Sequence, residues 1–151
     1  MHAALTWAAA PVNVVLLFLI VAAVIDVAVQ WIPDTLTAVA AGAVAASLSY
    51  AGITTHQVVV GALCGLLAFL VYLELGVRDI FGGGDVKLVP IPAFILGAVH
   101  PLLALWWFTA SIGLQGALSI GNRALKLPAG VPHLPAMTVT FAAASCFAAI
   151  F

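Results

Sequence analysis

Two aspartates in apolar surroundings are the residues best suited to do chemistry. Asp26 follows twelve apolar residues, 14–25, and three more apolar residues come after it. A carboxylate inside an apolar span is costly, so such residues usually face a protein interior or a wet cavity and find a partner there. Asp85 follows the glycines Gly82, Gly83 and Gly84, which permit close backbone approach and unusual dihedrals beside the carboxylate. Both aspartates are therefore candidates for a functional site.

A pair of carboxylates in one site has a definite chemistry. Like-charge repulsion and partial desolvation raise the pKa of one member, which leaves one acid and one base. The ionised member would deprotonate a bound water while the protonated member hydrogen-bonds the carbonyl of a scissile peptide. Each aspartate also has a simpler structural interpretation. Asp26 would cap a frayed helix end or reach to the membrane interface, and Asp85 would be the N-cap of a following helix.

The composition indicates the environment in which these carboxylates lie. The 151 residues are 66% hydrophobic and 6% charged, against about 25% charged in ordinary soluble domains. Apolar runs recur from Val12 onward, and crossing a bilayer takes about 20 apolar residues. Long runs of Leu, Ala and Val without alternation favour helices over a closed barrel. We predict one all-α domain over residues 1–151, a polytopic membrane helix bundle of about six transmembrane helices.

Proline, glycine and polar residues divide the chain into these expected spans. They cover residues 12–29, 36–50, 58–75, 88–99, 102–120 and 134–151. The fourth span is short and needs Asp85 and Lys87 in its opening turn. Pro90 and Pro92 should bend or unwind it, because proline lacks a backbone N–H and clashes with the preceding turn.

The charged residues predict how the spans are oriented. All four basic and five acidic residues fall around the first, third and fifth connections, whereas residues 51–57 and 100–101 carry none. Short loops rich in Lys and Arg stay in the cytoplasm, so both termini should face outward. This topology places Asp26 and Asp85 at the same membrane depth, which favours a shared site over two separate caps.

The remaining charged residues near the two aspartates are given structural roles. Asp34 follows a proline in the first turn and should start the second helix. Asp79 neighbours Arg78, and the two should form a solvated pair in a polar loop. Lys87 either holds Asp85 ionised or extends its charge to water.

Metal, cofactor and nucleic-acid chemistry are not expected. Cys64 and Cys146 each lie in an apolar run, where a small buried thiol is the ordinary interpretation, so neither a disulfide nor a zinc site is predicted. The net charge of −1 leaves no basic patch for nucleic acid or anionic lipid. We assign no chemistry to the histidines, which are His2, His56, His100 and His133.

The motifs around the two aspartates resemble a known family. Asp26 with Ile32-Pro33 downstream, followed by the run Gly82-Gly83-Gly84-Asp85-Val86-Lys87-Leu88, is similar to the prepilin peptidases, which are membrane aspartyl proteases with a GxGD motif. The resemblance extends from the first turn through the fourth helix. It implies that Asp26 and Asp85 are the catalytic pair, and that Gly82, Gly83, Gly84 and Lys87 belong to the motif or bind substrate.

The resemblance also implies a substrate and a location. The expected partner is the leader peptide of a type IV prepilin or pseudopilin, cleaved after a glycine at the cytoplasmic face of the bacterial inner membrane. Paired CxxC motifs are absent, so the chain looks like the compact Tad/Flp-type form, with peptidase activity and without N-methylation. Asp34 stands where Asn usually follows Ile-Pro, and Pro90 and Pro92 are unusual after the motif. These departures concern substrate preference more than chemistry.

Two other functions are compatible with the same sequence features. One is a catalytically inactive membrane scaffold that binds prepilins. The other is a transporter in which the aspartates bind a cation or relay protons, although a transport site would more often lie near the bilayer midplane.

Overall fold

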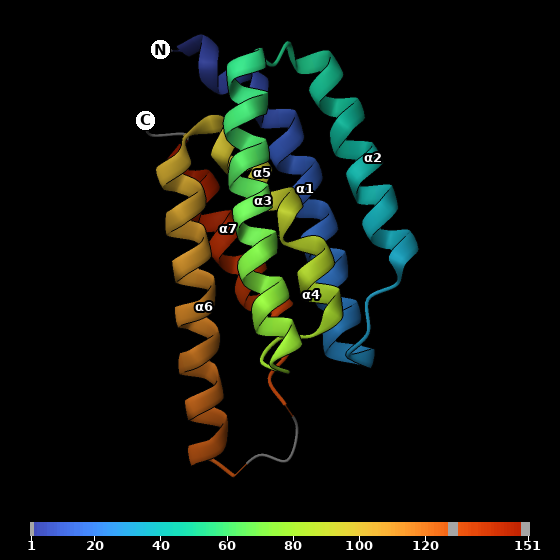
Figure 1. Cartoon of the computed structure of the whole chain (residues 1–151), viewed down its shortest axis with the longest axis vertical. Coiled ribbons are helices and arrows are strands. Elements are labelled where there is room, and N and C mark those ends of the chain that lie inside the picture. Colours follow the sequence, from blue (N-terminus) through green and yellow to red (C-terminus); the bar gives the residue numbers. More distant parts are fainter. Residues whose placement is uncertain (1, 127–129, 149–151) are drawn as a thin grey trace.

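The computed structural model describes residues 2–126 and 130–148, and within them every regular element is an α-helix. The all-α prediction is confirmed. Figure 1 shows the helices, with bounds α1 His2–Val29, α2 Asp34–Ala51, α3 Thr55–Val77, α4 Gly83–Leu88, α5 Pro90–Val99, α6 Pro101–Ala124 and α7 Leu134–Ala148. The expected spans match these helices to within a few residues at most ends. Residues 149–151 of the last expected span lie outside the described part.

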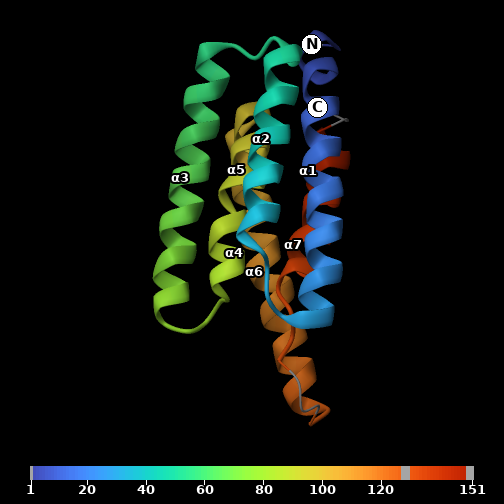
Figure 2. The same cartoon turned by 90° about the vertical axis from the view of Figure 1, so that its right-hand side faces the viewer.

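The chain passes back and forth between the two ends of the bundle, with α4 and α5 together making one passage (Figures 1 and 2). The connections α1–α2, α3–α4 and α6–α7 gather at one end, which we call the charged end. The connections α2–α3 and α5–α6 lie at the opposite end, near the N-terminus. This is the arrangement that the charge pattern predicts.

Several helices are suited to a bilayer. Residues Ala9–Val29 of α1, together with α3 and α6, are long and apolar enough to cross a membrane, and α7 is a shorter apolar helix. Large apolar side chains such as Leu17, Leu67 and Leu105 are more than half exposed. Exposed apolar surface of this extent marks contact with lipid or protein. The structure is that of a membrane helical bundle.

The fourth passage is interrupted next to its prolines. α4 ends at Leu88 and α5 begins at Pro90, and Val89 between them keeps helical dihedrals and donates its N–H to the carbonyl oxygen of Asp85 at 3.0 Å. α5 contacts α1, α3, α4, α6 and α7, and most of its side chains are buried. This short helix is therefore the centre of the bundle.

Glycines allow α3 and α5 to approach closely. A Cβ atom on Gly61 would lie 2.7 Å from the carbonyl oxygen of Phe94, and one on Gly97 would lie 2.5 Å from Cβ of Cys64. A Cβ on Gly65 would lie 3.0 Å from the carbonyl oxygen of Pro90. Small residues at helix interfaces let backbones approach in this way. We call Gly61, Gly65 and Gly97 the glycine seam.

The two cysteines differ from the prediction of buried thiols. Cys64 is partly buried beside the glycine seam, whereas Cys146 is exposed on α7. The prediction is wrong for Cys146, because an apolar run in a membrane helix has a lipid-facing side as well as a core side.

Side-chain hydrogen bonds hold α7 against its neighbours. Trp107 Nε1 donates to the carbonyl oxygen of Met137 at 3.1 Å, and Thr138 Oγ1 donates to the carbonyl oxygen of Leu19 at 3.1 Å. Such bonds join helices in an environment where water cannot compete for the polar groups. They fix α7 between α1 and α6.

Candidate active site

Asp26 lies near the last turn of α1 and binds the start of a helix that is distant in sequence. The backbone N–H of Leu134, the first residue of α7, donates to Asp26 Oδ2 at 3.3 Å. An anion at a helix N-terminus is favoured by the unpaired amides and the helix dipole. The half-buried carboxylate therefore caps α7, and the structural alternative in which it caps the frayed end of its own helix is wrong.

Asp85 is the third residue of α4 and is only 7% exposed. Its Oδ2 accepts a hydrogen bond from the N–H of Gly82 at 3.2 Å, so the bond runs back to the residue that precedes the helix. The structural alternative, in which Asp85 caps the amides that follow it, is wrong. Gly82 occupies the N-cap position.

The two carboxylates are brought to the charged end, close enough for the charge of one to act on the other. Asp85 lies outside the long apolar helices, and burial, followed by the negative charge of Asp26, raises the pKa of Asp85 to about 7. The hydrogen bond from Gly82 acts in the opposite direction. At neutral pH, Asp85 therefore carries a proton in part of the molecules. Burial and a neighbouring negative charge are the two causes that raise the pKa of one carboxyl where two carboxyls share a site.

Two glycines of the motif have distinct surroundings. A Cβ atom on Gly84 would lie 2.7 Å from Cγ1 of Ile32, which is itself buried. Ile32, in the connection after α1, therefore packs directly on the backbone beside Asp85, and a side chain at position 84 would collide with it. A Cβ on Gly83 would meet nothing within 4 Å.

Lys87 contacts the other motif segment and is not bonded to Asp85. Its Nζ lies 2.5 Å from Asp34 Oδ1, and both side chains are more than half exposed. Asp34 is the first residue of α2, as predicted. The pair links α4 to α2, and the structure gives no support to the interpretation that Lys87 holds Asp85 ionised.

The expected pair between Arg78 and Asp79 is wrong. Arg78 lies 2.6 Å from Glu74, one helical turn before it. Asp79 adopts a positive φ of 56° in the turn after α3, which directs the chain toward the glycines. An i,i+4 pair on a helix has better geometry than neighbours in a turn.

Sequence analysis missed a cluster of three aromatic rings at the charged end. Tyr72 of α3 is fully buried and His133, next to α7, is 4% exposed; the Tyr72 hydroxyl and His133 Nε2 lie 2.7 Å apart. Phe81 stacks on both, with ring centroids 4.8 Å from Tyr72 and 4.3 Å from His133. We call Tyr72, Phe81 and His133 the aromatic cluster. A buried tyrosine hydroxyl needs a polar partner, which is the one signal in the sequence that could have indicated it.

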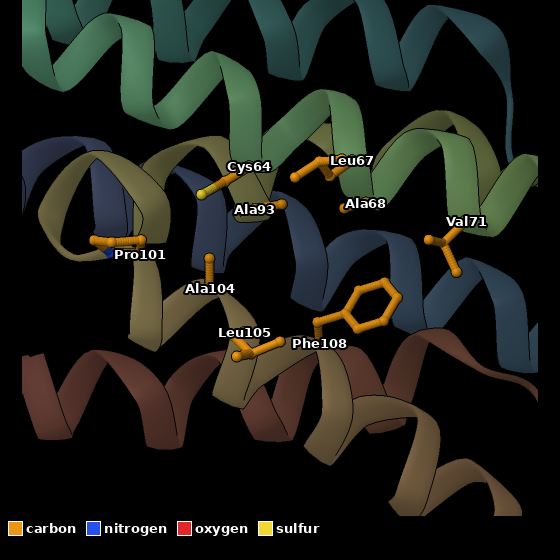
Figure 3. Close-up of a pocket in the computed structure, with 9 residues that line it drawn as sticks. All are labelled: Cys64, Leu67, Ala68, Val71, Ala93, Pro101, Ala104, Leu105 and Phe108. Atoms are coloured by element: carbon orange, nitrogen blue, oxygen red, sulfur yellow. The ribbon is translucent and has the colours of Figure 1, made fainter.

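An apolar pocket of about 350 Å³ lies between α3, α5 and α6 (Figure 3). It contains neither aspartate. Phe108 lines the pocket and also contacts Tyr72 edge-on, with ring centroids 5.6 Å apart. The pocket is lined by Cys64, Leu67, Ala68, Val71, Ala93, Pro101, Ala104, Leu105 and Phe108.

The described residues offer little for a metal ion. Within residues 2–126 and 130–148, no group of three or more His, Cys, Asp or Glu side chains is placed to hold one.

Comparisons with known proteins agree with the motif. Neither the search of curated proteins nor the search of solved structures gave a match. The sequence model of the type IV leader peptidase family matches residues 13–151, a range that includes both aspartates, the first turn and the glycine motif. Since the match takes in nearly all of the chain, the chain belongs to the type IV leader peptidase family.

Proposed function

We propose that the chain is an aspartic-type endopeptidase that removes the leader peptide from type IV prepilins or pseudopilins by cleavage after a glycine. Membership in a leader peptidase family supports a protease. The observation that carries the aspartic mechanism is the placement of two carboxyl groups at the charged end, with the Asp85 carboxyl buried and each group bound by a backbone N–H, that of Gly82 for Asp85 and that of Leu134 for Asp26. The raised pKa of Asp85 agrees with this placement.

The two carboxylates divide the chemistry between them. Asp26, which accepts the Leu134 amide, is the ionised member and takes a proton from a bound water. Asp85 is the protonated member and donates a hydrogen bond to the carbonyl oxygen that water attacks. The tetrahedral intermediate then expels the amine, which receives the proton that Asp26 took from water. No covalent intermediate with the protein forms.

The active site faces the cytoplasm in this proposal. All four basic residues, Arg78, Lys87, Arg123 and Lys126, lie at or next to the connections of the charged end. Short connections rich in Lys and Arg stay on the cytoplasmic side of a bacterial inner membrane. A leader peptide would reach the aspartates from that side, while the apolar helix that follows it stays in the bilayer.

Cleavage by purified variants in liposomes tests the proposal. Asp26→Asn and Asp85→Asn should each lower the rate on a prepilin substrate by about 10²- to 10⁴-fold, because Asn keeps the size of the side chain but cannot exchange a proton. Thermal unfolding checks that each variant is folded. Full activity in either variant would eliminate the pair of aspartates as catalysts, and would put the scaffold and transporter functions ahead.

A further inference from the structure

The aromatic cluster joins the two chain segments whose backbone N–H groups bind Asp26 and Asp85. Tyr72 lies in α3, Phe81 lies in the α3–α4 connection and His133 comes just before α7. The contact between Tyr72 and His133 spans 61 positions of sequence. The cluster thus joins the end of α3 and the connection after it to the start of α7, which is distant in sequence.

His133 is joined through its backbone to Asp26. The next residue, Leu134, donates its N–H to the Asp26 carboxylate. The carbonyl oxygen of His133 accepts hydrogen bonds from the N–H groups of Ala136 at 3.0 Å and Met137 at 3.2 Å, which start α7. Where the His133 ring is held therefore determines where the amide that binds Asp26 is presented.

Phe81 is joined in the same way to Asp85. The residue after it, Gly82, donates its N–H to Asp85 Oδ2. The Phe81 ring stacks on both Tyr72 and His133, at interplanar angles of 13° and 25°, and the ring centroids of Tyr72 and His133 are themselves 5.6 Å apart. The cluster therefore contains the residue that precedes the backbone donor of each aspartate, His133 before Leu134 and Phe81 before Gly82.

We propose that Tyr72 and His133 are positioning residues, which hold Asp26 and Asp85 at the separation that hydrolysis requires. The inference rests on the proposed function, since it concerns the same pair of aspartates. Neither residue is assigned contact with the substrate.

Ring packing alone does not explain the hydrogen bond between the Tyr72 hydroxyl and His133 Nε2. His133 is buried, and its Nδ1 has no hydrogen-bond partner among residues 2–126 and 130–148. An unpaired buried nitrogen is costly, and an apolar ring would fill the same space without that cost. Burial also lowers the pKa of His133 to about 4, so the ring is neutral at pH 7 and pairs with the Tyr72 hydroxyl without adding a charge. The contribution that compensates for the unpaired nitrogen is the bond to Tyr72.

Paired substitutions distinguish the two ring nitrogens. In full-length protein in liposomes, Tyr72→Phe removes only the hydroxyl and keeps the stack. His133→Gln places an amide near the position of Nε2, whereas His133→Asn places one near that of Nδ1. Tyr72→Phe and His133→Asn should lower kcat for a prepilin roughly three- to tenfold with KM nearly unchanged, the effect expected from one hydrogen bond. His133→Gln should retain most of the activity.

The pH profile gives a readout that a packing defect would not change. If the aspartates separate, their coupling weakens, so the two limbs of the bell-shaped rate profile should move toward each other in Tyr72→Phe and His133→Asn. Tyr50→Phe and His56→Gln are matched controls, since both residues are exposed and lie next to the α2–α3 connection, which is at the opposite end of the bundle (Figure 1). Both controls should match the wild type.

Several outcomes would overturn the inference. One is a wild-type kcat and pH profile in both Tyr72→Phe and His133→Asn. Another is cleavage activity that is retained in His133→Asn and lost in His133→Gln. A third is a loss of thermal stability in Tyr72→Phe and His133→Asn with both limbs of the pH profile unmoved. If Tyr72→Phe does not fold, the comparison of His133→Gln with His133→Asn decides alone. Full activity in Asp26→Asn or Asp85→Asn would refute the proposed function itself. If both of these variants are inactive while Tyr72→Phe and His133→Asn behave like the wild type, only the inference is refuted.

Discussion

Replacing Asp85 with Asn should stabilise the protein at neutral and alkaline pH while lowering the cleavage rate by about 10²- to 10⁴-fold. The ordinary pKa of the carboxyl is 3.8, and in the folded protein it is raised to about 7 by burial and by the charge of Asp26. Between these two values the folded protein holds a proton on Asp85 that the unfolded chain has lost. Wild-type stability should therefore fall as the pH rises from about 4 to about 7.

The size of this effect follows from the shift. A rise of the pKa from 3.8 to about 7 corresponds to about 4 kcal/mol of unfolding free energy, fully expressed above pH 7 and absent below pH 4. Asn cannot ionise, yet its carbonyl oxygen can still accept the Gly82 N–H. In a chain of this length about 4 kcal/mol amounts to roughly 8–16 °C in Tm.

Thermal unfolding in detergent between pH 4 and pH 8 measures the difference directly. The Tm of Asp85→Asn should rise above that of the wild type progressively across this range, with equal values at the acid end. Asp79→Asn, a change in an exposed turn, is the matched control and should show no such trend. A Tm difference between Asp85→Asn and wild type that stays constant from pH 4 to pH 8 would refute the assignment of a buried carboxyl with a raised pKa.

Three further predictions concern the motif, the substrate site and the topology. Gly84→Ala should cost about 1–3 kcal/mol of stability and reduce cleavage, because the new Cβ would lie 2.7 Å from a buried side chain, whereas Gly83→Ala, which meets open space, should be nearly neutral in both assays. Asp34→Asn breaks only an exposed ion pair, so more than half of the cleavage rate should remain and unfolding should change by less than about 1 kcal/mol; loss of cleavage would assign Asp34 to substrate binding. A reporter fused after Arg123 should read cytoplasmic and one near Thr54 external, and an external reading after Arg123 would contradict the topology.

The helices and their order could be predicted because they depend on local signals. Apolar runs give the lengths of the membrane helices, and the break at Pro90 follows from the chemistry of proline itself. The placement of Asp26 and Asp85 at one end also follows, since each helical passage reverses the direction of the chain. Membrane depth is a one-dimensional property, and a sequence contains enough information to derive it.

Contacts between passages could not be predicted, because they depend on how each helix is rotated about its axis. Lys87 meets Asp34 across 53 positions, and Tyr72 meets His133 across 61. Nothing near His133 in the sequence distinguishes it from the other histidines, because the contact that brings its neighbour Leu134 to Asp26 spans 108 positions. Lateral position around the bundle is the information that apolar periodicity does not supply in a membrane protein, where both the core side and the lipid side of a helix are apolar.

The glycine seam has a consequence for how the molecule moves. Where backbones interlock at the distances that Gly61, Gly65 and Gly97 impose, sliding one helix along the other would drive side-chain and carbonyl atoms into each other. α3 and α5 should therefore shift as one rigid body. If a substrate requires the bundle to open, the opening should occur by hinge or shear displacement at the other interfaces of α5, while the distance between α3 and α5 stays constant.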